Sequence, residues 1–236
     1  VYNPEVQDFI NFSAAYLSET ERSIHKPPSG MITAFSYGTA LFFAFWDEYY
    51  NEDVSRMIAL QESLVDLDED DMILAVLDQL DDVATDWMVF SKWNLATNLR
   101  SGEMESYSFA GRLFGLQSEM EGTMIEDEYR FYPLATTYFE LEHAGGDCTF
   151  AYVGEDEDVQ FALHPVVSGD KVGPSIKEWR IGDEPIWTED LSAGEYWVIG
   201  TLPILADGSQ KIEFCLGAEC VVPEIEDTAE SEPMSK

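Results

Sequence analysis

Residues 133–142, Pro-Leu-Ala-Thr-Thr-Tyr-Phe-Glu-Leu-Glu, mark a change in the hydrophobic period of the chain from 3.6 residues to 2. Alternating apolar and polar residues are typical of a strand with one buried face, because successive side chains point to opposite sides of a sheet. The six segments that alternate in this way, with glycine-containing turns between most of them, are residues 137–142, 148–153, 159–163, 175–181, 194–200 and 211–215. Short strands at regular spacing predict an antiparallel β-sandwich over residues 133–222.

The residues before Pro133 show a helical period instead. Apolar side chains recur three and four positions apart near residues 5–18, 54–65, 73–83 and 87–95. Residues 31–50 are apolar almost all round, which is typical of a helix at the centre of a bundle. We therefore expect the α+β class, with a helical lobe over residues 1–132.

Two stretches stand apart from this pattern. In residues 100–132, glycines interrupt an aromatic-rich sequence, so we expect a long ordered loop or a pair of short elements there. Residues 223–236 are acidic and nearly devoid of large apolar side chains, which predicts a flexible tail.

The charge of the chain limits its partners. Its 236 residues include 47 acidic and 12 basic side chains, giving a formal net charge of -35. So few cations cannot form a surface that follows phosphates, which argues against nucleic acids and anionic membranes. The longest nearly uncharged apolar stretch, residues 31–46, is shorter than the ~20 residues that span a bilayer, so we expect no membrane span. The even spread of acids suits a salty or calcium-containing exterior, or serves solubility alone.

Cysteine usage and the first residues favour an extracellular, processed protein. Three cysteines are too few for a disulfide scaffold. Cys215 and Cys220 flank a glycine-containing turn where a disulfide can close, although two free thiols are the alternative. Cys148 is then left over, either buried or paired in a way that the sequence does not reveal. The chain begins at Val1 without an initiator methionine, so we expect a processed or truncated product whose signal peptide has been removed.

Metal and nucleophile motifs are weak. His25, His143 and His164 are isolated, with neither a His-Glu-x-x-His helix nor a paired Cys-x-x-Cys. The sequence around Ser36 imitates the elbow that carries the nucleophile of serine hydrolases. That fold alternates strands and helices, so a serine in a buried helix is the favoured interpretation. We predict no catalytic, cofactor-binding or metal-ligating residue in this chain.

Two acidic segments raise the question of calcium. In residues 66–71 an EF-hand loop would need Gly at its sixth position and Glu at its twelfth, where Asp71 and Leu77 stand. Acids at the start of a helix, favoured by the helix dipole, are the other interpretation. Residues 155–158 form a second acidic turn, so calcium stays an alternative at both places.

Several segments together resemble secreted zincin-type metalloproteases, a family of myxobacterial and related extracellular enzymes. One segment is similar to the family's Tyr-Gly-x-x-Leu-Phe helix. It reads Tyr-Gly-Thr-Ala-Leu-Phe-Phe-Ala-Phe at residues 37–45 and is followed by Glu-Tyr-Tyr at 48–50. Residues 90–98 resemble the Phe-x-x-Trp-Asn-x-x-Thr-Gly stretch that closes its helical lobe, with Asn98 in place of glycine. Residues 132–141 resemble the start of its β-sandwich appendage, and residues 1–21 the segment after its third zinc ligand.

The resemblance implies that the zinc ligands of the family would precede Val1. No ligand or catalytic residue therefore transfers to this chain, and zinc would enter only if an N-terminal half supplied the ligands. The implied function is the non-catalytic C-terminal part of a secreted zincin-like metallopeptidase, whose partner is that N-terminal half or a second copy. Whether the chain contributes to an enzyme stays open. The alternative is an extracellular structural or adhesive surface protein that self-assembles through its acidic, aromatic-rich surface.

Overall fold

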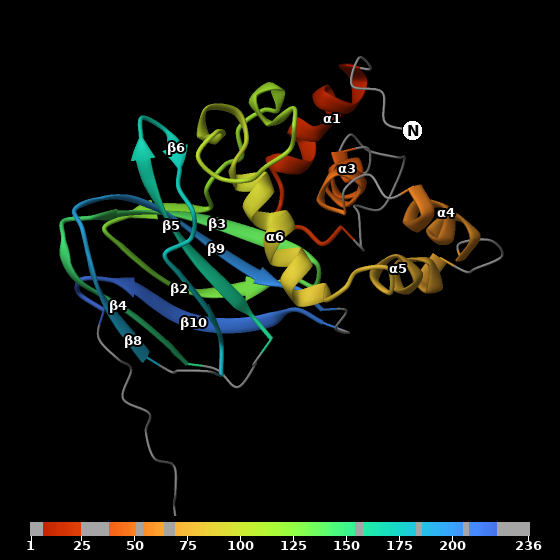
Figure 1. Cartoon of the computed structure of the whole chain (residues 1–236). Coiled ribbons are helices and arrows are strands. Elements are labelled where there is room, and N and C mark those ends of the chain that lie inside the picture. Colours follow the sequence, from red (N-terminus) through yellow and green to blue (C-terminus); the bar gives the residue numbers. More distant parts are fainter. Residues whose placement is uncertain are drawn as a thin grey trace, which may run out of the picture.

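A group of helices precedes two β-sheets in this computed structural model, which describes residues 7–24, 38–50, 54–63, 69–153, 158–182, 186–204 and 208–220 (Figure 1). The described helices are α1 (Gln7–Leu17), α3 (Ala40–Tyr49), α4 (Val54–Ser63), α5 (Glu69–Leu77) and α6 (Val83–Leu95). They overlap the segments whose apolar period predicts them, but the period over residues 73–83 continues past the end of α5 at Leu77 to the first residue of α6, Val83. The structure confirms the α+β class. The tail expected over residues 223–236 lies outside the described residues.

Helix α6 shows how the local sequence sets an element. Asp82 is its N-cap, and the Asp82 side chain accepts a hydrogen bond of 2.7 Å from the backbone N–H of Thr85. This contact satisfies a donor that the first helical turn leaves free, and it lowers the pKa of Asp82. The buried aromatic face of α6 then packs against both the other helices and the sheet. One prediction was wrong in part: α3 is not buried all round, because Phe43 is 41% exposed.

The strands form two sheets. The six-stranded sheet has the order β1-β3-β9-β5-β6, with β7 pairing with β5, and the four-stranded sheet has the order β2-β10-β4-β8. Neighbouring strands are antiparallel except β1 and β3, which are parallel. The strands are β1 (Met120–Gly122), β2 (Met124–Phe131), β3 (Ala135–His143), β4 (Gly146–Val153), β5 (Gln160–Ser168), β6 (Lys171–Val172), β7 (Lys177–Arg180), β8 (Ile186–Leu191), β9 (Gly194–Leu202) and β10 (Gln210–Gly217).

All six predicted strands are present, as β3, β4, β5, β7, β9 and β10. The structure adds β2 and β8, which the sequence pattern did not predict, and the short β1 and β6. Residues 100–132 contain a short 3-10 helix (Ala110–Arg112) as well as β1 and β2, so the sheets begin before Pro133. The division into a helical domain over 1–132 and a sandwich domain over 133–222 as separate folding units stays a prediction.

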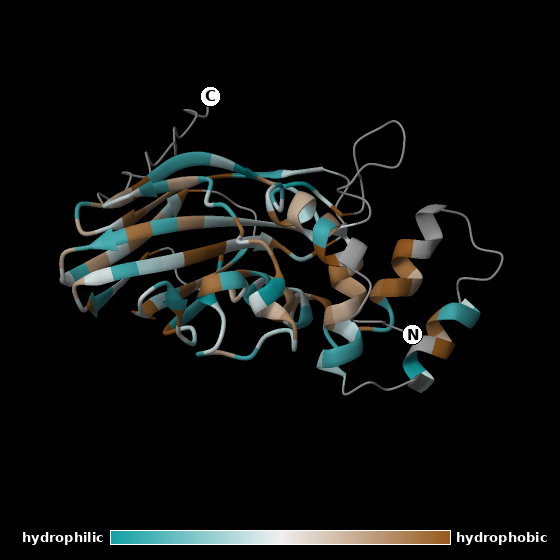
Figure 2. Ribbon diagram, turned by 90° about the horizontal axis from the view of Figure 1, so that it is seen from above, coloured by the Kyte–Doolittle hydropathy of each residue, from teal (hydrophilic) through white to brown (hydrophobic). Residues whose placement is uncertain are grey.

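The two sheets enclose an aromatic core. Phe150, Phe161 and Trp179 meet there at ring-centroid distances of 4.9 to 5.4 Å. Gly200 on β9 makes room for this packing, because a Cβ at that position would lie 2.7 Å from the ring of Phe131. Hydrophobic and hydrophilic residues interleave along the strands, as a sandwich with buried inner faces requires (Figure 2).

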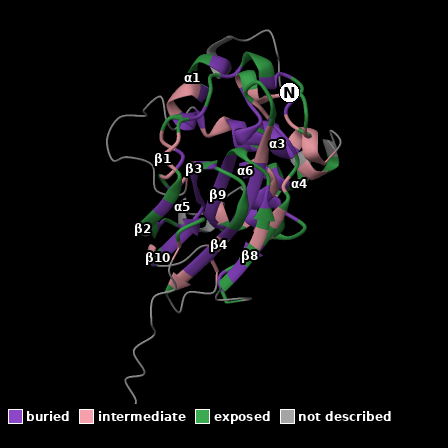
Figure 3. Cartoon of the chain, turned by 90° about the vertical axis from the view of Figure 1, so that its left-hand side faces the viewer, coloured by how far each residue is buried: buried purple, intermediate pink, exposed green. Residues whose placement is uncertain are grey.

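A second core lies between the helices and the outer face of the six-stranded sheet. It joins residues of α1, α3 and α6 to Tyr138, Ala162 and Ile199 on three strands. Buried residues accordingly gather both between the sheets and beneath the helices (Figure 3). The helices and the six-stranded sheet therefore share a hydrophobic interface. None of the helices in the described ranges is long and apolar enough to cross a membrane.

Candidate functional site

The helix motif around Gly38 belongs to the packing of the helices. A Cβ placed on Gly38 would lie 2.6 Å from the carbonyl oxygen of Phe12 and 2.7 Å from the Cβ of Tyr16. Glycine therefore allows α1 to cross the start of α3 at close range. Beyond this crossing, Phe42 meets Phe90 at 5.3 Å, and Phe45 meets the ring of Trp93 at 5.2 Å. The motif residues that the structure describes thus hold helices together.

The second motif, residues 90–98, ends in a turn with a specific backbone requirement. Asn98 has a φ of 55°, in the left-handed region that glycine and asparagine tolerate best. This is the position at which Asn98 replaces the glycine of the zincin-type pattern. Upstream of it, the Asn94 side chain accepts a 2.7 Å hydrogen bond from the hydroxyl of Tyr107. Burial raises the pKa of Tyr107 well above its usual range, so the hydroxyl stays protonated as this donor.

The histidines do not form a site together. His164 is fully buried on β5, with its Nδ1 3.0 Å from the carbonyl oxygen of Gly173, and burial lowers its pKa to about 4. His143 lies at the end of β3, with its Nε2 3.1 Å from the carbonyl oxygen of Gly146. His25 lies outside the described residues, as does Ser36. In the described ranges, no group of three or more His, Cys, Asp or Glu side chains has an arrangement that suits a metal ion.

The acidic segments are described only in part. Residues 66–68 and 155–157 lie outside the described residues. Residues 69–71 are the first residues of α5. Asp158, the last acid of the second segment, forms an ion pair with Arg180 on β7. Calcium binding at either segment stays a prediction.

The structure has a disulfide between Cys215 and Cys220, whose Cα atoms are 5.7 Å apart across the turn that follows β10. Cys148 is a free cysteine and is fully buried between the sheets. Burial raises its pKa to about 11, so the thiol is protonated at neutral pH and is a poor nucleophile.

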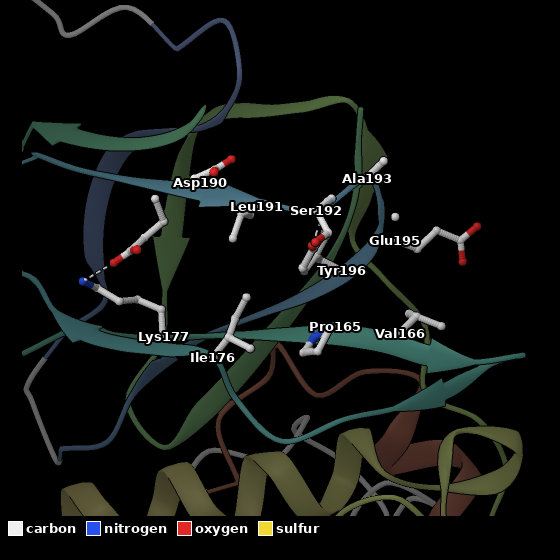
Figure 4. Close-up of a pocket in the computed structure, with 12 residues that line it drawn as sticks. Pro165, Val166, Ile176, Lys177, Asp190, Leu191, Ser192, Ala193, Glu195 and Tyr196 are labelled. Carbon is white, nitrogen blue, oxygen red and sulfur yellow. Dashed lines mark hydrogen bonds and ion pairs between the residues drawn. The ribbon is translucent and has the colours of Figure 1, made fainter. Parts of the chain in front are cut away.

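A groove of about 460 Å³ opens on one side of the sandwich, where the edges of the two sheets approach each other (Figure 4). One wall is the end of β8 with the turn into β9, and the other comes from β5 and the start of β7. An ion pair of 3.0 Å between Lys177 and Glu189 bridges the two walls. The residues that line the groove include Pro165, Val166, Ile176, Asp190, Leu191, Ser192, Glu195 and Tyr196. The hydroxyl of Tyr196 donates to the carbonyl oxygen of Ser192 at 2.9 Å, which holds the turn in place.

A smaller recess of about 250 Å³ lies beside Arg100. The Arg100 guanidinium sits 4.2 Å above the ring of Trp197 and donates a 3.1 Å hydrogen bond to the carbonyl oxygen of Leu116. Burial lowers the pKa of this arginine, against the attraction of Glu140 and Asp170 nearby. Among the described residues that line these two hollows, no serine or cysteine is paired with a histidine.

Sequence patterns did not predict either hollow. Glu189 stands at the inward position between Trp187 and Leu191 and interrupts the apolar spacing, so the sequence pattern does not predict a strand here. The remaining signal was the even spacing of the two apolar residues Trp187 and Leu191, which the structure places among the buried residues.

Comparison with known proteins leaves the family open. No family model matches the sequence, and no curated protein matches it. Among solved structures, the chain is similar to a periplasmic inhibitor of g-type lysozyme, PliG of Aeromonas hydrophila, with 12% identity over 43% of this chain and 98% of that chain, at a TM-score of 0.29. It is also similar to the pre-peptidase C-terminal domain of a collagenase from Bacillus anthracis, with 11% identity over 44% of this chain and 98% of that chain, at a TM-score of 0.32. A mitogen of Yersinia pseudotuberculosis gives 11% identity over 43% of this chain and 91% of that chain, also at 0.32. Likenesses this weak carry no argument about function.

Proposed function

We propose that this chain is the non-catalytic C-terminal part of a secreted zincin-like metallopeptidase, with a helical lobe and a β-sandwich appendage. One observation carries the proposal: the four separated segments that resemble the family meet in the second core. Phe90 of the second motif lies 6.2 Å from Tyr16 of α1 and 5.3 Å from Phe42 of α3, measured between ring centroids. Next to it, the carbonyl oxygen of Ser91 accepts a 2.8 Å hydrogen bond from Tyr138 of β3.

The resemblance requires this meeting, because motifs that build the core of one fold pack against one another. The conformation of Asn98 adds to it, since the residue that departs from the pattern keeps the backbone geometry that glycine would favour. The described motif residues are buried and hold elements together. Their part in the proposed protein is to build a rigid support for whatever the N-terminal half supplies.

The proposed location is outside the cell. A disulfide between Cys215 and Cys220 persists in oxidising compartments and is rare in the cytosol. An acidic surface of net charge -35 repels itself least in a medium whose salt screens it.

Zinc titration and a peptidase assay on the chain test the proposal. We expect no stoichiometric zinc after dialysis and no hydrolysis of a denatured protein substrate. Stoichiometric zinc together with hydrolysis would show a complete catalytic site and contradict the non-catalytic role. The coding sequence upstream of Val1 gives an independent test, because the proposal requires a His-Glu-x-x-His segment there.

A second candidate is an extracellular structural or adhesive surface protein that self-assembles through its acidic, aromatic-rich surface. Its support is that Leu99, which lines the Arg100 recess, and Phe114, which precedes the lining residue Gly115 in the sequence, are 68% and 53% exposed. Light scattering as a function of protein and calcium concentration decides between the two. A strict monomer under all conditions would refute assembly.

A further inference from the structure

The outer edge of β8 has no other strand paired with it in the described part of the chain. This strand ends the four-stranded sheet and pairs with β4 alone among the described strands (Figure 1). Along its other side, the backbone N–H and C=O groups have no strand beside them in the described part of the chain. Such an edge is a template on which another extended segment can pair.

The groove lies beside this edge. In Figure 4 the end of β8 and the turn that follows it face β5 and Ile176 across the hollow. Leu191, Pro165 and Ile176 make its lining partly apolar, and Ile176 is 50% exposed although it is a large hydrophobic residue. A strand added to β8 would point every second side chain toward this hollow, because the side chains of a strand alternate between two faces. The groove thus offers room for apolar side chains at alternate positions.

The charge beside the groove is negative. Glu189, Asp190 and Glu195 line it, and Lys177, the one cation among the described residues that line it, is already paired with Glu189. On the outer face, Asp190 stands directly opposite Asp147 of β4. Like charges opposite each other on neighbouring strands are destabilising, and none of the ion pairs found in the described ranges includes either aspartate. A cation placed next to β8 would relieve this repulsion.

We propose that the β8 edge and its groove bind an extended basic peptide segment of a partner protein. The segment pairs its main chain with β8, buries alternate apolar side chains against Leu191 and Ile176, and sets basic side chains beside Asp190 and Glu195. This inference stands on the edge, the groove and the charges, and does not depend on the proposed peptidase relationship.

A second copy of the chain suits this edge poorly. Pairing β8 with β8 would bring Glu189 and Asp190 of one copy against the same acids of the other. Each copy also carries a net charge of -35, so approach of two copies is opposed before contact. A basic partner is attracted by the net negative charge as it approaches and by the acids beside β8 once it is in contact.

Two labelled octapeptides of equal charge serve as probes, one alternating Lys and Val and one alternating Lys and Gly. Fluorescence anisotropy at low ionic strength measures their binding to the whole chain. We expect the Lys-Val peptide to bind at least about tenfold more tightly, since only it fills the groove. Equal binding of the two peptides would show a non-specific attraction to the acidic surface and overturn the proposal.

Charge reversal locates the site. We expect Asp190→Arg with Glu195→Arg to weaken binding of the Lys-Val peptide by about tenfold or more. The matched control is Glu126→Arg with Glu213→Arg, which changes the net charge equally at exposed positions on β2 and β10. We expect the control to weaken binding by less than about threefold. Equal losses in both double variants would overturn the proposal.

Main-chain pairing has its own test. Lys-Val peptides that are N-methylated at alternate residues lose every donor on one side of the strand. We expect one of the two methylation registers to abolish binding and the other to preserve it, because only one set of N–H groups faces β8. Equal behaviour of both registers would rule out strand pairing, and a stable dimer of the protein that excludes the peptide would identify a second copy as the occupant.

Discussion

Replacing Gly38 tests both the helix packing and the importance of the motif that contains it. In Gly38→Ala the new methyl carbon would start 2.6 Å from the carbonyl oxygen of Phe12 and 2.7 Å from the Cβ of Tyr16. Contacts shorter than 3.0 Å require movement, and both neighbours belong to or adjoin the backbone of α1, so the whole helix must shift. Overpacking of this kind typically costs about 1–3 kcal/mol.

Helix propensity acts in the opposite direction. Alanine is favoured over glycine within a helix by about 1 kcal/mol, so propensity alone predicts a more stable protein. We expect the steric cost to prevail, with a net loss of about 1–2 kcal/mol in the free energy of unfolding. Gly38→Leu should lower the free energy of unfolding further, because the leucine side chain starts from the same Cβ position and has more volume to accommodate.

Urea unfolding followed by circular dichroism measures these changes through the midpoint at constant slope. The matched control is Gly194→Ala, where a Cβ would meet nothing within 4 Å and φ is not positive. We expect that variant to lie within about 0.5 kcal/mol of the parent protein or to be slightly more stable. A Gly38→Ala protein that is more stable than the parent would refute the close crossing of α1 and α3.

Four further outcomes are expected. Trp93→Ala should lower the free energy of unfolding by about 3–5 kcal/mol, whereas Phe114→Ala on the surface should change it by less than about 0.5; urea midpoints measure both. The thiol of Cys148 should react with a disulfide reagent at pH 8 only after unfolding, because its pKa is raised to about 11 and it is buried; rapid labelling of the native protein would contradict this. His164 should destabilise the fold as pH falls from 6.5 toward 4, because its folded pKa of about 4 lies below the usual value, so the unfolded state binds the proton first. The full loss in the free energy of unfolding is about 3 kcal/mol, and this loss should be absent when the stability of His164→Gln is measured against pH. Added sodium chloride should raise the urea midpoint at pH 7, because it screens the repulsion within a chain of charge -35; an unchanged midpoint would mean that the acids are already neutralised.

The elements that sequence patterns predicted have at least one buried face, and β3 and β9 are buried on both faces instead of on the single face that alternation predicts. On β3 and β9 nearly every residue is buried, since one face meets the other sheet and the opposite face meets the helices or the adjoining loops. In the helices the apolar period follows from one face being covered by the second core. In such segments, burial in the folded protein requires apolar residues at the buried positions. The spacing of these apolar residues in the sequence therefore predicts the element.

The two longer strands that sequence patterns missed are the two edges of the four-stranded sheet. β2 contains three consecutive acids at residues 126–128, and β8 contains Glu189 and Asp190. A position that points inward at a sheet edge lies near solvent, so it accepts a charge that a central strand would exclude. Asp127 is exposed although it alternates with Ile125 and Tyr129, and Glu189 reaches Lys177 across the open side of the sandwich. The groove was missed partly for the same reason, because one of its walls is an edge strand with the turn after it, whereas its other wall comes from β5 and the start of β7.

Acids on an edge strand have two consequences that follow from the same electrostatics. They keep copies of an acidic protein from pairing edge to edge, which is one way in which natural sheets avoid aggregation. They also attract any extended segment of opposite charge, and attraction is most useful where a groove can accept its side chains. On β8 the acids and the groove lie together, whereas β2 carries acids without that groove. The difference between these two edges is why charge reversal near β8 and the same reversal on β2 and β10 should have different effects on peptide binding.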